Sequence, residues 1–204
     1  MKAKFTLFLL PAALCLAQEN NAAPKNELAF GLGELPSLSR SNSPSLDVGP
    51  GVALQVNYGR RFLKSSKVAL YGEINFVASP TAREITTSVN TATHDFASLY
   101  ITPGIRVKFR PSSRISPYAV VGGGYADYEQ SLTQINGRPN PAPRQLARGV
   151  FDFGAGVDVH VWRFVALRGE ARDFYTGSPN YNITSISGGQ HNIVATGAFV
   201  LRWH

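Results

Sequence analysis

The stretch HNIVATGAFVLRW, residues 191–203, decides the fold that this sequence predicts. Polar and apolar residues alternate along it. Asn192, Thr196 and Arg202 share one face, and the other face carries Ile193, Ala195, Gly197, Phe199, Leu201 and Trp203. A period of two residues is typical of a β-strand whose faces meet different environments. We therefore predict a strand with one apolar and one polar face.

Seven earlier segments show the same alternation. With the segment above, the predicted strands are residues 27–34, 51–62, 67–78, 95–109, 115–128, 148–160, 164–174 and 191–203. Pro103 interrupts the fourth strand, where proline usually marks an edge or a bulge. We keep this strand because its alternation resumes in phase. The fifth contains three consecutive glycines, Gly122 to Gly124, so its facing is not assigned.

The connections between these strands alternate strictly between long and short. The long ones are residues 35–50, 79–94, 129–147 and 175–190, and the short ones are 63–66, 110–114 and 161–163. Short turns at one end and long loops at the other are typical of membrane barrels with an even number of strands. The sequence thus predicts an all-β protein: an eight-stranded, antiparallel, up-and-down transmembrane β-barrel over residues 27–204.

Aromatic residues recur near the ends of these strands. Phe62, Phe109, Trp162 and Trp203 fall at the short-turn end, whereas the residues towards the long loops are Phe76, Phe96, Tyr125, Phe151 and Tyr175. Aromatic girdles at both membrane interfaces are a feature of such barrels.

The N-terminal residues predict export. Lys2 and Lys4 precede an apolar run over residues 5–17, and Ala17 closes a small-residue cleavage site, so residues 1–17 are predicted to be a signal peptide. The run is shorter than the roughly 20 residues of a membrane-spanning helix. Residues 18–26 are polar and form a predicted disordered lead. Cleavage removes Cys15, the only cysteine, so we expect no disulfide.

Composition excludes one class of partner. Hydrophobic residues make up 44% of the chain and charged residues 16%, and the net charge is +7. Lysine and arginine are scattered through strands and turns, without the clustered basic face of a nucleic-acid-binding module. We therefore expect no nucleic-acid partner. The excess positive charge is better explained by attraction to the phosphates of membrane lipids.

The polar faces of the strands carry opposite charges that would meet inside the barrel. The phase of the alternation places nine charged residues there: Glu73, Asp152, Asp158 and Glu170 against Arg106, Lys108, Arg168, Arg172 and Arg202. Eight strands enclose little more than their own side chains, and unpaired buried charges are costly. We predict that these residues pair into a network that plugs the lumen.

Three segments carry a resemblance to a known family: GAFVLRW at 197–203, LRGEARDFY at 167–175 and ISPYAVVGGGY at 115–125. The mature chain resembles the small OmpA-like or OmpX-like outer-membrane β-barrels. The resemblance implies a monomer in the cell outer membrane, in contact with its lipids and lipopolysaccharide. It also implies recognition by the outer-membrane assembly machinery through a terminal signal at Phe199, Leu201 and Trp203. His204 departs from the family pattern, in which the aromatic residue is usually last.

The expected role is non-enzymatic, in envelope integrity or in surface interaction through the long loops. Arg138, Arg144 and Arg148 flank the third long loop and form a candidate binding site for lipopolysaccharide phosphates. A narrow porin-like passage for small solutes is the first alternative.

Two further alternatives remain open. A lipid A modifying enzyme would need a nucleophile, a base and an orienting group together. His94 with Asp95 and Ser98, or His191, offers members of such a set without a supporting spacing, so no catalytic, metal or cofactor site is expected. A soluble lipocalin-like carrier would turn the apolar face inward, and alternation alone does not distinguish inside from outside.

Overall fold

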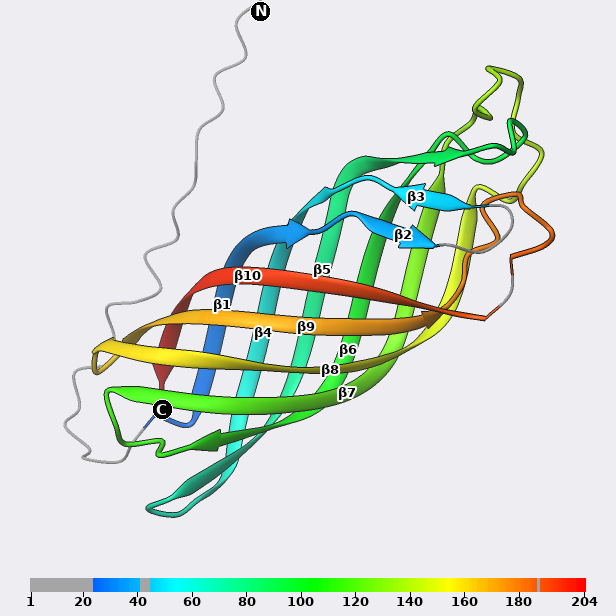
Figure 1. The fold of residues 1–204 in the computed structure, drawn as a ribbon. Coiled ribbons are helices and arrows are strands. Elements are labelled where there is room, and N and C mark those ends of the chain that lie inside the picture. The colour runs from blue at the N-terminus through cyan, green and yellow to red at the C-terminus, as the bar shows by residue number, and fades with distance from the viewer. Residues whose placement is uncertain (1–23, 41–44, 187) are drawn as a thin grey trace, which may run out of the picture.

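Eight long antiparallel strands close into a barrel (Figure 1). The computed structural model describes residues 24–40, 45–186 and 188–204, so the predicted signal peptide and residues 18–23 of the lead lie outside the described residues. Pairing of β1 with β10 and of β5 with β6 completes the ring. The barrel strands are β1 (Asn26–Leu35), β4 (Gly51–Lys64), β5 (Val68–Thr87), β6 (Asp95–Phe109), β7 (Ile115–Gln130), β8 (Gln145–Trp162), β9 (Val165–Gly177) and β10 (Gly189–Trp203). The predicted eight-stranded up-and-down barrel is confirmed.

Two short strands correct the prediction for the first long connection. Instead of an irregular loop, it contains β2 (Leu38–Arg40) and β3 (Leu46–Val48), which pair with each other. β5 continues beyond its predicted end at Ala78 and pairs with β3 through Ile85, Thr86 and Thr87. These β-branched residues favour extended structure, and the extension follows a register shift between Ser79 and Arg83.

Long and short connections lie at opposite ends of the barrel, as predicted (Figure 1). The C-terminus lies at the short-turn end, beside the start of β1, because Asn26 pairs with Trp203. The long connections gather at the other end. No helix within the described part of the chain has the length and apolarity needed to cross a membrane.

The outer wall of the barrel is apolar and the interior is polar. Leu32, Ile105 and Phe151 are between 50% and 62% exposed on the wall, whereas the charged residues of the same strands point inward and are buried. A soluble carrier needs the opposite arrangement, so the lipocalin-like alternative is wrong. Phe96 was expected towards the lipid-facing girdle but is buried inside the barrel.

The structure also settles the facing of β7. Tyr118 and Tyr128 point into the barrel, and Tyr125 lies on the outer wall. A Cβ added to Gly124 would lie 2.1 Å from the carbonyl oxygen of Ile101 on β6, so the two backbones approach too closely for any side chain there. β6 passes through Pro103 without changing its register to β5, where Pro103 pairs with Ile74.

Candidate functional site

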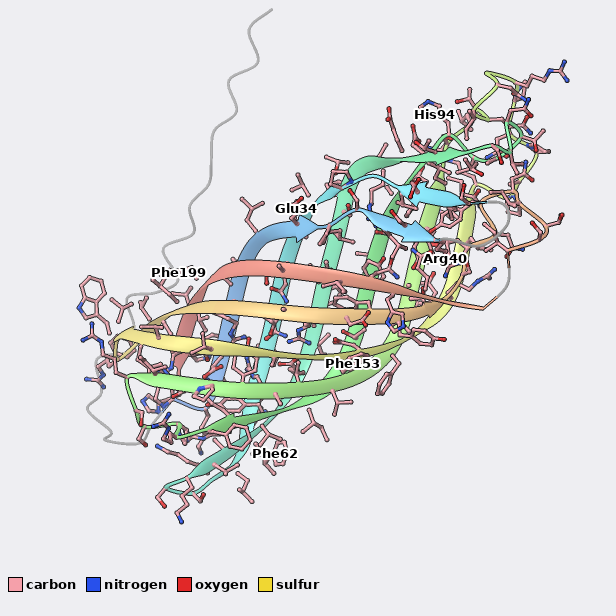
Figure 2. All side chains as sticks on the ribbon, in the orientation of Figure 1. Glu34, Arg40, Phe62, His94, Phe153 and Phe199 are labelled. Atoms are coloured by element: carbon pink, nitrogen blue, oxygen red, sulfur yellow. The ribbon has the colours of Figure 1, made fainter. Side chains whose placement is uncertain are left out.

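Polar and apolar side chains line the strands of the barrel (Figure 2). Glu27 is the centre of an ion-pair network in the half of the barrel nearest the short turns. Its carboxylate accepts hydrogen bonds from Lys108 Nζ at 2.6 Å, Arg106 Nη2 at 3.0 Å and Arg168 Nη2 at 3.1 Å. Asp158 binds two of the same cations, through Arg168 Nε at 2.7 Å and Lys108 Nζ at 2.7 Å. All five side chains are buried, and the two carboxylates offset most of the charge of the three cations.

Arg172 organises the second half of the network. Its guanidinium lies 2.6 Å from Glu73, 2.9 Å from Asp152 and 2.7 Å from Glu170. Arg106 joins the two halves, because its Nε lies 3.3 Å from Glu73 Oε2. The network therefore runs continuously from Glu27 to Asp152.

The structure brings together eight of the nine residues predicted for the interior, and it adds a residue that the sequence analysis missed. Glu27 follows the inward phase of Ala29 in β1, and that phase was the available signal. Arg202 lies at the edge of the network, partly exposed, with its Nε 3.9 Å from Glu27 Oε1. With Glu27 included, five carboxylates face four buried cations and this peripheral arginine.

Aromatic rings separate the cations of the network. The Arg106 guanidinium lies 4.9 Å from the ring centre of Tyr71 and 5.4 Å from that of Tyr118, and Arg168 lies 5.1 Å from the Tyr118 ring. Cations over ring faces gain electrostatic stabilisation. A Cβ added to Gly156 would lie 2.3 Å from Tyr118 Oη, so the absence of a side chain at Gly156 makes room for this ring.

A second, apolar layer fills the long-loop half of the interior. Tyr100 packs on Phe174 with ring centres 4.8 Å apart, and Phe96 packs on Tyr181 at 5.1 Å. Tyr181 belongs to the last long loop, and its hydroxyl donates to Gln190 Oε1 at 2.7 Å. Burial raises the pKa of Tyr181 well above its usual range. The layer continues through buried residues of the strands and loops, namely Leu35, Leu46, Val48, Ala53, Val77, Ile85, Ala92, Ala126, Tyr128, Val150, Ile183 and Val194.

The long loops bind one another above this layer. The Thr93 amide donates to the carbonyl oxygen of Tyr181 at 2.9 Å, and Asn182 Nδ2 donates to that of Thr91 at 2.7 Å. The Ile135 amide donates to the carbonyl oxygen of Ala92 at 3.0 Å. The loops after β5, β7 and β9 therefore form one ordered cap, which we call the loop cap.

The three arginines proposed for surface binding lie in or beside the loop cap but contact different partners. Arg144 pairs with Glu129, with Nε 2.8 Å from Oε1, and both are exposed. Arg148 Nε donates to the carbonyl oxygen of Ser178 at 3.4 Å. Arg138 is exposed. The structure thus leaves the Arg138 and Arg144 guanidinium groups accessible from outside.

The histidines considered for catalysis each pair with an aspartate. His94 Nδ1 lies 2.9 Å from Asp95 Oδ2, and His191 Nδ1 lies 2.6 Å from Asp173 Oδ2. Ser98 is buried on the inner wall. Within the described residues, no hydroxyl group forms a hydrogen bond with either imidazole, and no three His, Cys, Asp or Glu side chains gather as metal ligands.

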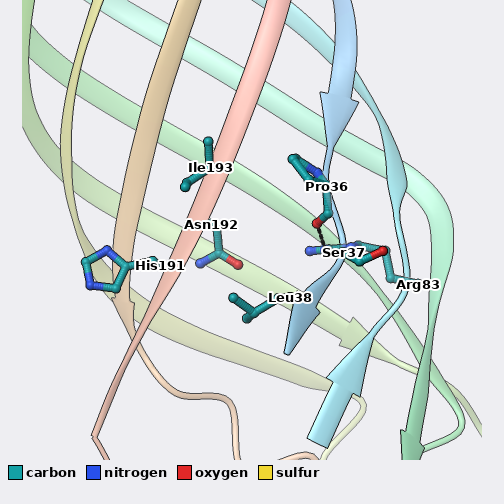
Figure 3. A pocket seen from close by; sticks show the side chains of 7 residues that line it. All are labelled: Pro36, Ser37, Leu38, Arg83, His191, Asn192 and Ile193. Carbon is teal, nitrogen blue, oxygen red and sulfur yellow. Dashed lines mark hydrogen bonds between the residues drawn. The ribbon is translucent and has the colours of Figure 1, made fainter. Parts of the chain in front are cut away.

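A small pocket lies where β1 leaves the wall of the barrel (Figure 3). Pairing between β1 and β10 ends at Glu34 and Ala195, and the chain then turns towards β2. Arg83 is buried beside the pocket and donates to the carbonyl oxygens of Pro36 and Gly49, each at 2.9 Å. The pocket is lined by Pro36, Ser37, Leu38, Arg83, His191, Asn192 and Ile193.

An apolar outer wall, a neutralised polar interior and a closed ring of strands define a membrane-spanning β-barrel. The comparisons with known proteins agree. The model of the family described as outer membrane protein beta-barrel domain matches residues 5–199, so the chain belongs to this family and lies in the outer membrane. None of the curated proteins matches it.

Solved structures with similar folds are outer-membrane barrels. The attachment invasion locus protein Ail of Yersinia pestis has a TM-score of 0.55 and 9% identity, over 89% of this chain and 99% of Ail. OprG of Pseudomonas aeruginosa has a TM-score of 0.57 and 9% identity, over 89% of this chain and 97% of OprG. The Neisserial surface protein NspA has a TM-score of 0.53 and 12% identity, over 87% and 96% of the two chains. At these identities, the likeness shows the fold alone.

Proposed function

We propose that this protein is a closed, non-enzymatic barrel that contributes to envelope integrity and presents the loop cap at the cell surface. The observation that carries the proposal is the filled interior. The ion-pair network occupies the half nearest the short turns, and the aromatic layer around Tyr100 and Phe174 occupies the other half. A solute would have to displace both layers, and separating the buried charges costs several kcal/mol each.

Planar-bilayer recordings test this closure. Purified, refolded protein is expected to show no steady conductance steps, under conditions in which a general porin produces them. Reproducible unitary steps from the wild-type protein would favour the alternative, a narrow passage for small solutes. A separate experiment with cells tests envelope integrity. Cells that express the protein should take up an apolar dye more slowly than cells that lack it.

Surface interaction is the second part of the proposal, and the accessible arginines of the loop cap support it. Arg138 and Arg144 have exposed guanidinium groups, which bind phosphate oxygens in fork geometry. The partner we propose is the phosphate-bearing part of lipopolysaccharide. We also retain as predictions that the barrel is a monomer and that assembly machinery recognises its terminal signal, of which Phe199 and Leu201 are exposed on the outer wall.

Charge reversal tests the arginines. The variant Arg138→Glu, Arg144→Glu, Arg148→Glu is expected to bind purified lipopolysaccharide at least tenfold more weakly than the wild type, because attraction becomes repulsion at three positions. The matched control carries three reversals at the opposite end, Lys67→Glu, Arg114→Glu and Arg163→Glu. Unchanged binding by the loop variant, or equal loss in both, would contradict a site in the loop cap.

A further inference from the structure

The positive charge of this barrel is concentrated at its short-turn end. Nine cationic residues lie there, and each of the three short turns and both ends of the described chain contribute at least one. We call this set the basic rim: Lys25, Arg60, Arg61, Lys64, Lys67, Arg110, Arg114, Arg163 and Arg202. Among the described residues, the carboxylates closest to it in the strands, Glu27 and Asp158, point into the lumen and are already paired.

The long-loop end has a different balance. Its described residues include five arginines, Arg40, Arg83, Arg138, Arg144 and Arg148, and its carboxylates outnumber them: Glu34, Asp47, Glu84, Asp95, Asp127, Glu129 and Asp173. The positive excess of the described residues is therefore a property of one rim. Charge that served solubility alone would be spread evenly over both ends of the barrel.

Aromatic side chains fix the height of the basic rim in the membrane. Phe62, Phe109 and Trp162 are 62%, 44% and 74% exposed on the outer wall, each within one or two residues of a rim cation. Arg202 directly precedes Trp203, and aromatic residues of this kind lie at the membrane–water interface. The flexible lysine and arginine side chains just beyond them reach the level of the lipid phosphates.

Several rim cations have no competing partner among the residues that the structure describes. In the part of the chain that the structure describes, the side chains of Arg60, Lys67 and Arg114 form no hydrogen bond or ion pair. Arg163 stacks on Phe164, with its guanidinium 4.7 Å from the ring centre. Their charges are available to a ligand outside the barrel.

We propose that the basic rim binds the phosphate groups of anionic phospholipids in the periplasmic leaflet, which is the leaflet that short turns face in this family. The cations lie in all three short turns and at both ends of the described chain, so they are distributed around the circumference, as an annulus of lipid is. An acidic protein would contact one sector. Each cation near an anionic membrane surface strengthens binding by about fivefold.

Lipid selectivity measures this directly and does not depend on the function of the loop cap. The refolded protein is reconstituted in phosphatidylcholine vesicles that contain trace spin-labelled phosphatidylglycerol or spin-labelled phosphatidylcholine. The motionally restricted fraction of each label gives their relative association constant. The test variant is Lys67→Gln, Arg114→Gln, Arg163→Gln, and the control, three charge removals among exposed residues of the long-loop end, is Glu34→Gln, Asp47→Asn, Glu84→Gln. Migration of boiled and unboiled samples on a denaturing gel verifies folding of each variant.

The wild type is expected to prefer the anionic label severalfold, and the rim variant to lose at least a factor of three of that preference. The control variant should keep it. Raising NaCl from 0.1 to 1 M should also reduce the preference, because exposed charges are screened. An unchanged preference in the rim variant, or equal loss in both variants, would overturn the proposal. The proposal would also be overturned if the wild type showed no preference for the anionic label. An acidic periplasmic protein would then be the next candidate partner of the basic rim.

Discussion

Glu27 is the carboxylate on which three buried cations of the interior converge. It contacts Lys108, Arg106 and Arg168, and it is 1% exposed. Asp158 neutralises only part of the charge of these three cations. Removing one partner from a buried ion pair costs more than the pair contributes, because the remaining charge has neither water nor a counter-ion.

The variant Glu27→Gln is therefore expected to lower the free energy of unfolding by about 3 to 5 kcal/mol. The amide keeps the shape of the side chain but leaves the cations short of one negative charge. Urea titration in detergent, with the folded fraction read from gel mobility without boiling, measures the change. Glu34→Gln, on the same strand but exposed, is the control and should leave stability unchanged. Equal stability of both variants would show that the interior charge is hydrated.

Closure of the ring depends on close backbone packing between the first and last strands. Gly33 on β1 pairs with Thr196 on β10, and a Cβ added to Gly33 would lie 1.9 Å from the carbonyl oxygen of Ala195. That atom belongs to the backbone of the paired strand β10, so it cannot swing away as the end of a flexible side chain can. By contrast, a Cβ added to Gly197 meets nothing within 4 Å.

This contrast predicts different effects for two alanine substitutions on the same seam. Gly33→Ala is expected to destabilise the barrel by about 1 to 3 kcal/mol, because the neighbouring backbone must shift. Gly197→Ala should have little effect. Heat-modifiability over a temperature series measures both, and the midpoint at which the compact band disappears should fall for Gly33→Ala alone. Equal midpoints for the two variants would contradict this prediction, because they would show that the backbones of β1 and β10 move apart at Gly33 at no cost in stability.

The alternation of residues predicted the barrel strands and most of the interior, because each side chain's direction follows from its position in the strand. Glu27 was missed although its phase was readable, since the predicted strand began at that residue. The β2–β3 hairpin and the inward position of Tyr181 had no comparable signal. Both depend on contacts between loops distant in sequence, and no local period records such contacts.

The charges of the whole molecule fall into three zones with different solvent access. The interior network is buried and nearly balanced, the basic rim is strongly positive, and the long-loop end carries more carboxylates than arginines. Salt screens the interaction between exposed charges that lie further apart than the Debye length, which is about 10 Å at 0.1 M and about 3 Å at 1 M. It screens buried pairs much less. The same solvent change should therefore affect the zones unequally.

Salt titration is expected to separate the interior from the rim. The loss of stability caused by Glu27→Gln should be the same at 0.1 and 1 M NaCl, because ions do not reach the network around Arg106 and Lys108. The preference for phosphatidylglycerol should fall over the same range. If the effect of Glu27→Gln instead shrank with salt, ions would be entering the lumen. That result would overturn the closed barrel and favour the narrow passage, even if conductance were too small to record. A salt-insensitive effect requires a dry interior, as the packed aromatic layer beneath Tyr181 implies.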